Sequence, residues 1–175
     1  MQQKTLDLVG RNHTVAQTKD AFYLARKLGF DNINMDLILG LPGELEADVQ
    51  RTIEKIVELA PDSLTVHSLA IKRASRLNQW IQENGVSMLH NTDETMKIAA
   101  AGAEKLGMKP YYLYRQKNTL QNLENVGWCK PGHEGYYNIY IMEEVQTILS
   151  AGAGGSTKLV ADGGKRMQRI FNFKY

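Results

Sequence analysis

An acidic residue, Asp36, lies in the middle of a run that alternates apolar and polar side chains. A period of two places Ile33, Met35, Leu37 and Leu39 on one face of an extended strand, where they can pack under helices. The opposite face then carries the Asp36 carboxylate, which needs a partner or a ligand if it looks into a protein interior. Two interpretations stay open: a ligand-binding carboxylate, or a structural one bonded to backbone amides of a neighbouring loop.

The elements around this strand predict how the carboxylate is positioned. Gly40-Leu41-Pro42-Gly43 ends the strand, and apolar residues recur at helical spacing between Val49 and Ala60. Another helix is predicted from Thr14, a suitable cap, to Gly29, and a second strand from Ser63 to Ala70. Alternating helices and strands favour parallel strands in an α/β sheet or barrel.

The rest of the chain predicts less regular structure. We expect a short helix at Ser75–Glu83 and a longer one at Asp93–Leu106, whose small residues Ala99–Ala103 permit a close approach to a neighbouring element. Near the end, strands at Thr147–Val160 and Arg166–Phe173 are predicted, joined as a hairpin through Asp162-Gly163-Gly164. A complete eight-fold α/β barrel takes about 250 residues. The chain is therefore either a small α+β domain or part of something larger.

Composition excludes several classes of function. The chain has 175 residues, 43% of them hydrophobic, and a net charge of +2, without a bilayer-spanning stretch or a secretory signal. We expect a cytoplasmic protein that binds neither nucleic acid nor membranes. The single cysteine, Cys129, excludes an internal disulfide and any metal cluster held by several thiolates of this chain. The four histidines also lack metal-ligand spacing, so no metal site is predicted.

Four runs of sequence carry a family resemblance: NINMDLILGLPGE, HSLAIKRAS, YYLYRQKNTLQNLENVGW and NIYIMEEVQTILSAGAGGSTK. They resemble the radical S-adenosylmethionine (SAM) enzymes of the oxygen-independent coproporphyrinogen III oxidase group, and most closely its coproporphyrinogen dehydrogenase-like branch. The likeness covers only the C-terminal part of such an enzyme. Family members begin with C-x-x-x-C-x-x-C, which holds a [4Fe-4S] cluster, and this chain has no such motif. We therefore expect Met1 to be an internal methionine of a longer protein.

The resemblance implies a fold and an activity. The fold would be α/β, with the C-terminal βα units of a partial (β/α)6 radical SAM barrel at 1–108 and an appended α+β segment at 109–175. The intact parent would use SAM and the [4Fe-4S] cluster to decarboxylate porphyrinogen propionates oxidatively in haem biosynthesis. This fragment alone would be inactive and carry no catalytic residue. Its partners would be a porphyrinogen and, through open barrel edges, other copies of the chain.

The resemblance also implies cofactor-binding residues. Three positions fall at the spacing of family residues that contact SAM: Arg11, Asp36 and Ala70. A guanidinium can pair with the cofactor's carboxylate, a carboxylate can accept hydrogen bonds from ribose hydroxyls or the amino group, and Ala70 would act through its backbone. A glycine-rich run similar to a strand end that approaches the adenosine adds three further positions: Gly152, Gly154 and Ser156.

Substrate contacts are implied for Tyr114, Arg115 and Asn118, where an aromatic face would cover a tetrapyrrole and Arg115 would pair with a propionate. For Tyr111 and Tyr112 a core strand is favoured. His67 is expected on the same side as Asp36.

Two other functions stay open. Some proteins with this barrel carry haem as chaperones, but that branch is marked by an H-N-x-x-Y-W type sequence, and here His90-Asn91 is followed by Thr-Asp-Glu-Thr. The chain would alternatively be a self-sufficient α+β domain without a catalytic role.

Overall fold

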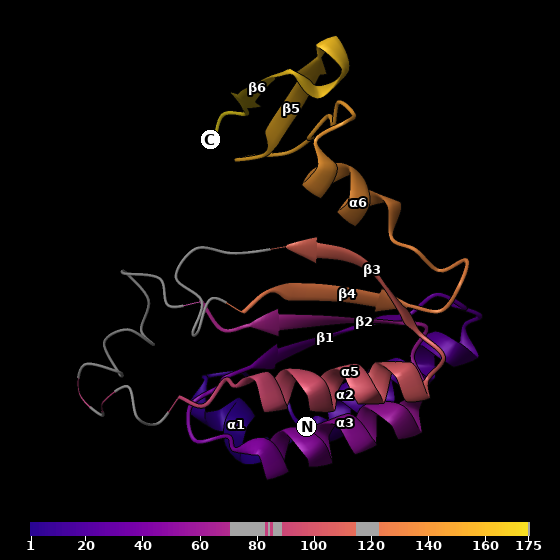
Figure 1. The fold of residues 1–175 in the computed structure, drawn as a ribbon, viewed down its shortest axis with the longest axis vertical. Coiled ribbons are helices and arrows are strands. Elements are labelled where there is room, and N and C mark those ends of the chain that lie inside the picture. The colour runs from indigo at the N-terminus through magenta and orange to yellow at the C-terminus, as the bar shows by residue number, and fades with distance from the viewer. Residues whose placement is uncertain (71–82, 84, 86–88, 115–122, 175) are drawn as a thin grey trace. The chain divides into compact units, whose positions relative to one another are not determined.

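The computed structural model describes residues 1–70, 83, 85, 89–114 and 123–174, which form two compact units, Met1–Glu134 and Gly135–Tyr175 (Figure 1). Strands at 109–114 and 125–129 pair in the same sheet as the strands before residue 108, and the compact units divide after Glu134. The boundary after residue 108 that the family resemblance implies stays a prediction. The helix predicted at 75–83 falls almost wholly outside the described residues. In the part that the structure describes, no helix is long and apolar enough to cross a membrane.

The first unit is built on a four-stranded sheet in the order β1-β2-β4-β3 (Figure 1). β1 (Asn34–Leu39) and β2 (Ser63–Ser68) are parallel, as the alternation of helices and strands predicts. β4 (Asn125–Cys129) is antiparallel to β2, and β3 (Lys109–Tyr114) is antiparallel to β4. The sheet is therefore mixed, and its antiparallel half has no counterpart in the βα pattern of the sequence.

The described part of the first unit contains four helices, and local sequence signals predict three of them. α1 (Gln3–Leu8) is short, and α2 (Val15–Lys27) begins at Thr14, whose side chain accepts from the Gln17 amide in a capping box. α3 (Glu46–Leu59) follows β1, and α5 (Asp93–Lys105) precedes β3. The two helices run side by side along the sheet (Figure 1). The predicted helices 14–29, 49–60 and 93–106 are confirmed to within a few residues.

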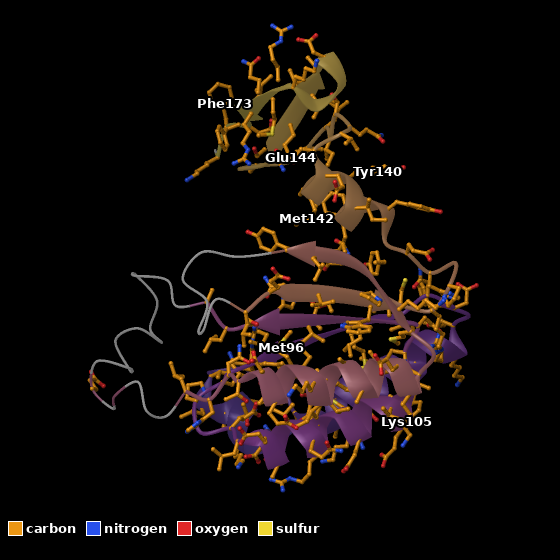
Figure 2. The ribbon with its side chains drawn as sticks, in the orientation of Figure 1. Met96, Lys105, Tyr140, Met142, Glu144 and Phe173 are labelled. Atoms are coloured by element: carbon orange, nitrogen blue, oxygen red, sulfur yellow. The ribbon has the colours of Figure 1, made fainter. Side chains whose placement is uncertain are left out.

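The core lies between the sheet and these two helices. Leu39, Leu64 and Val66 from the strands are at most 1% exposed and pack with side chains of α3 and α5. Figure 2 shows Met96 on the side of α5 that faces the sheet. Gly102 brings the two helices close together, because a β-carbon at this position would lie 2.2 Å from Cγ2 of Ile53. The close approach expected from the small residues of this helix is confirmed.

The second unit contains α6 (Tyr136–Glu143) and a hairpin of β5 (Ser156–Ala161) and β6 (Arg166–Phe171), joined through a 3₁₀ turn at Asp162–Gly164. The predicted hairpin is confirmed, but the strand predicted at 147–160 is too long, since β5 begins only at Ser156. Gly152 and Gly154 have positive φ angles that interrupt extended backbone.

An ion pair between Glu144 and Lys158 joins the end of the helix to the hairpin in the second unit. Lys158 Nζ donates to Glu144 Oε1 at 2.8 Å, and Figure 2 shows Glu144 just beyond the end of α6. The hydrogen bond from Lys158 lowers the pKa of Glu144. Glu144 is therefore paired, not merely solvated.

Candidate functional site

A cavity of about 990 Å³ lies in the first unit, within the range of small-molecule sites. Its wall comes from α1 and the loop after it, from β1 and the turn that follows, and from the end of β2. This is the face of β1 that carries Asp36, because Met35 and Leu39 pack into the core on the other side. Leu37 packs against the core as well and also borders the cavity. The predicted division of the strand into an apolar and a polar face is confirmed.

Three residues predicted to bind one cofactor line this cavity together: Arg11, Asp36 and Ala70. Arg11 follows α1 and is placed by Gly10, whose φ of 70° turns the chain in a way that favours glycine. Asp36 lies in the centre of β1, and Ala70 comes just after the end of β2. A cation, a carboxylate and a small residue thus border the same space. Their role in binding stays a prediction.

The burial expected for Asp36 is wrong. Its side chain is 65% exposed, because this face of β1 is not covered within the described residues. The carboxylate is nonetheless held by side chains: the Asn34 amide donates to Oδ1 at 2.7 Å, and His67 Nε2 lies 3.9 Å from Oδ2. His67 is on the same side as Asp36, as predicted. The alternative of a carboxylate bonded to loop amides does not match these partners.

Glu44 is a cavity residue that the sequence did not reveal. It is 7% exposed, lines the cavity, and accepts a hydrogen bond from the Thr5 hydroxyl at 2.7 Å. This bond attaches α1 to the turn after β1. A charged residue directly after a Gly-Leu-Pro-Gly turn was the only local signal for it. His13, in the loop after Arg11, also lines the cavity.

The predicted substrate residues are only partly described. Tyr114 ends β3 and is 40% exposed, whereas Arg115 and Asn118 lie outside the described residues. Tyr111 and Tyr112 do belong to a strand, and their rings meet edge to face with centroids 4.8 Å apart. Both are half-buried.

The glycine-rich run belongs to the second unit. Gly152 and Gly154 lie in the turn before β5, and Ser156 is the first residue of that strand. The run thus precedes a strand, whereas the resemblance likened it to a strand end. Its contact with a cofactor stays a prediction.

The chemistry of the side chains fits one predicted cofactor and not the other. An Arg and an Asp at an open cavity can bind the charged and hydroxyl groups of SAM. A [4Fe-4S] cluster needs several thiolates, but Cys129 is the only cysteine, and the described residues contain no group of three or more His, Cys, Asp or Glu that would hold a metal. Cys129 is 2% exposed, and burial raises the pKa of its thiol, which makes it unreactive.

Comparison with known proteins gives concordant similarities. The model of the radical SAM superfamily matches residues 1–56. The chain is 46% identical over 159 residues to the oxygen-independent coproporphyrinogen-III oxidase-like protein HemZ of Bacillus subtilis, covering 91% of this chain and 32% of HemZ. It is 30% identical over 152 residues to the heme chaperone HemW of Lactococcus lactis, covering 86% of this chain and 37% of HemW.

A solved structure shows the same fold. The coproporphyrinogen III oxidase HemN from Escherichia coli, described as a radical SAM enzyme, superimposes with a TM-score of 0.67 at 18% identity. The match covers all of this chain and 39% of HemN. The chain therefore spans about a third of the length of the relatives it matches.

Proposed function

We propose that the chain, which belongs to the radical SAM superfamily, is the C-terminal portion of an oxygen-independent coproporphyrinogen III oxidase-like protein and supplies part of a SAM-binding wall. One observation carries the proposal: Arg11, Asp36 and Ala70, separated in sequence by up to 59 residues, border one cavity. Bound SAM would supply a reactive sulfonium nucleoside whose cleavage generates a radical. The cluster that feeds it an electron would have to come from outside this chain.

Each residue has a distinct task in this proposal. The Arg11 guanidinium pairs with the cofactor's carboxylate in a forked geometry. The Asp36 carboxylate accepts hydrogen bonds from the ribose hydroxyls or the α-amino group. Ala70 leaves room for the ligand beside its backbone, and α1 and the β1–α3 turn complete the cavity wall. Gly152, Gly154 and Ser156 are retained as further proposed contacts.

We expect Arg11→Ala and Asp36→Asn each to weaken SAM binding by about tenfold, because each removes a charge-assisted contact. The measurement is titration of the 175-residue chain with SAM, followed by amide NMR shifts. Asp20→Asn, an exposed position on α2 that does not line the cavity, is the matched control. A wild-type chain that does not bind SAM at millimolar concentration, or variants that bind as tightly as the wild type, would contradict the proposal.

For the intact protein we propose the oxidative decarboxylation of a porphyrinogen propionate to a vinyl group, with release of CO₂, one proton and two electrons. SAM would be the oxidant, because its conversion to methionine and 5′-deoxyadenosine takes up one proton and two electrons. HemZ, the relative at 46% identity, is named for a coproporphyrinogen oxidase-like character, and this supports the substrate class. Tyr114, Arg115 and Asn118 would contact that substrate, with Tyr114 exposed at the end of β3. The predicted cytoplasmic location stays a prediction.

The finer fold is also part of the proposal. We propose that the parallel strands β1 and β2 belong to a partial (β/α)6 barrel. In the described sheet β1 is an edge strand, so its outer edge is available for pairing with another strand. Open edges attract other strands. Sedimentation velocity should therefore show the 175-residue chain associating as its concentration rises. A monomer over the whole range, melting cooperatively, would favour the self-sufficient α+β domain instead.

A haem chaperone is the second candidate, supported by the 30% identity to HemW. His90-Asn91 does not continue as the chaperone sequence, and Asn91 is occupied structurally, since its Oδ1 accepts from Thr95 Oγ1 at 3.0 Å. A sharp Soret shift on titrating the chain with haem, together with no response to SAM, would favour this candidate.

A further inference from the structure

Four residues lie opposite one another on the four neighbouring strands of the first unit's sheet, in a row that includes Asp36 and is here called the rung. Asp36 on β1 pairs with Thr65 on β2, Thr65 with Gly127 on β4, and Gly127 with Tyr112 on β3. Residues directly opposite each other in neighbouring strands project their side chains to the same face. Thr65 and Tyr112 therefore share the face that carries the Asp36 carboxylate and the cavity.

Gly127 allows Tyr112 to reach toward β1. A β-carbon at Gly127 would lie 1.9 Å from Cε1 of the Tyr112 ring, so the ring lies directly over the backbone of β4. A bulge between Pro110 and Tyr112 shifts the register of β3 here. As a result the Tyr112 ring extends over β4 toward Thr65 on the next strand, and burial raises the pKa of its hydroxyl.

The hydrogen bonds continue from Thr65 to Asp36. Thr65 Oγ1 donates to Asn34 Oδ1 at 3.2 Å, and Asn34 Nδ2 donates to Asp36 Oδ1 at 2.7 Å. Chemistry allows only this direction, because an ionised carboxylate accepts and cannot donate. The amide of Asn34 must then turn its oxygen to Thr65.

We propose that Asn34 and Thr65 are positioning residues that fix the Asp36 carboxylate for a ligand hydroxyl or ammonium group. Asn34, held by Thr65, occupies Oδ1 and limits the rotation of the carboxylate, while Oδ2 lies 3.9 Å from His67 Nε2 and stays available to a ligand in the cavity that both residues line. Asp36 is 65% exposed, so packing alone would not hold its side chain. The identity of the ligand rests on the proposed function. The hydrogen bonds from Thr65 to Asn34 and from Asn34 to Asp36, here called the relay, are present in the ligand-free chain.

The test compares Thr65→Ser, which keeps the hydroxyl, with Thr65→Val, which keeps the shape and removes it. Two readouts are taken: the three-bond couplings that report the Asp36 χ1 rotamer without ligand, and the affinity for SAM. We expect Thr65→Val to average the Asp36 rotamers and to weaken SAM binding about three- to tenfold, with Thr65→Ser close to the wild type.

Urea unfolding of each variant checks that the fold is retained, and Asn34→Ala provides a second break in the relay if Thr65→Val unfolds. A fixed Asp36 rotamer in both Thr65→Val and Asn34→Ala would overturn the inference. If the wild type does not bind SAM, but the fixed Asp36 rotamer of the wild type is lost in Thr65→Val, the proposed function is overturned and the positioning role of Thr65 stands. The two failures are thus distinguishable.

Discussion

Replacing Asp62 with alanine is expected to destabilise the first unit by about 3 kcal/mol, because it leaves two cations around a buried position without their anion. The Asp62 side chain is 8% exposed. Its Oδ2 lies 2.5 Å from Arg26 Nη1 and accepts from the Ile33 amide at 3.0 Å, while its Oδ1 accepts from Lys130 at 3.2 Å. One carboxylate thus joins α2, the approach to β1 and the end of β4. Urea unfolding followed by circular dichroism measures the loss.

The same carboxylate predicts an acid limit for stability. Burial alone would raise the pKa of Asp62, but the bonds from Arg26, Ile33 and Lys130 outweigh it and hold the pKa at about 2. A carboxyl with a depressed pKa stabilises the fold above its unfolded pKa of about 4, and this contribution is lost as the pH falls toward 2. It amounts to roughly 2 kcal/mol.

The wild type should therefore lose stability between about pH 4 and pH 2 more steeply than Asp62→Ala does. The matched control is Asp31→Ala, an exposed aspartate next in sequence to Asn32 and Ile33, which should follow the wild type. Equal stability of Asp62→Ala and Asp31→Ala at neutral pH would show that the cluster contributes nothing. Asp48, whose pKa is lowered mainly by the Leu45 amide and the Gln2 side chain, adds to the acid response of all these proteins.

Replacing Gly102 with valine is expected to cost about 2–3 kcal/mol, because the new side chain would overlap the core between α3 and α5. The β-carbon alone would lie 2.2 Å from Cγ2 of Ile53, which is itself 4% exposed and confined by its neighbours. Either the helices separate or Ile53 leaves its rotamer, and both lose packing. Thermal and urea unfolding report the change.

A double-mutant cycle shows whether the overlap is the cause. Ile53→Ala on its own removes core volume and destabilises, but combined with Gly102→Val the total cost should be smaller than the sum, because the valine fills the vacated space. Ala101→Val, at the exposed neighbouring position of α5, serves as the control for placing a β-branched residue in the helix. Additive costs in the cycle would refute the close-packing explanation.

The proposed ligand site and the stabilising Asp62 carboxylate involve the same strands of the first unit. Asp62 holds together the start of β2 and the end of β4, and the rung from Asp36 to Tyr112 crosses these same strands a few residues further along. A loss of register between β1 and β2 would separate Thr65 from Asn34 and release the Asp36 side chain. The proposed ligand site depends on a mixed sheet remaining in register across elements distant in sequence.

The sequence by itself determined the local elements of this protein. The family resemblance, and no local signal, indicated Arg11, Asp36 and Ala70, which border one cavity. Thr14 and the apolar spacing before Ala60 indicated helices at the positions observed, and alternation around Asp36 separated an apolar face from a polar one. These signals act over a few residues, through hydrogen-bonded caps and the fixed periods of helix and strand. The cysteine count likewise excluded a cluster site without any structure.

Only the tertiary structure decided the exposure of Asp36, the burial of Glu44 and the place of Tyr112 on the cavity face of the sheet. Each depends on which strand lies beside which and in what register. Tyr112 reaches Thr65 only because Gly127, from a third strand, lies between them without a side chain. Pairing between strands so far apart in the chain is fixed by the packing of the whole unit and by a bulge, and these leave no periodic signal in the sequence.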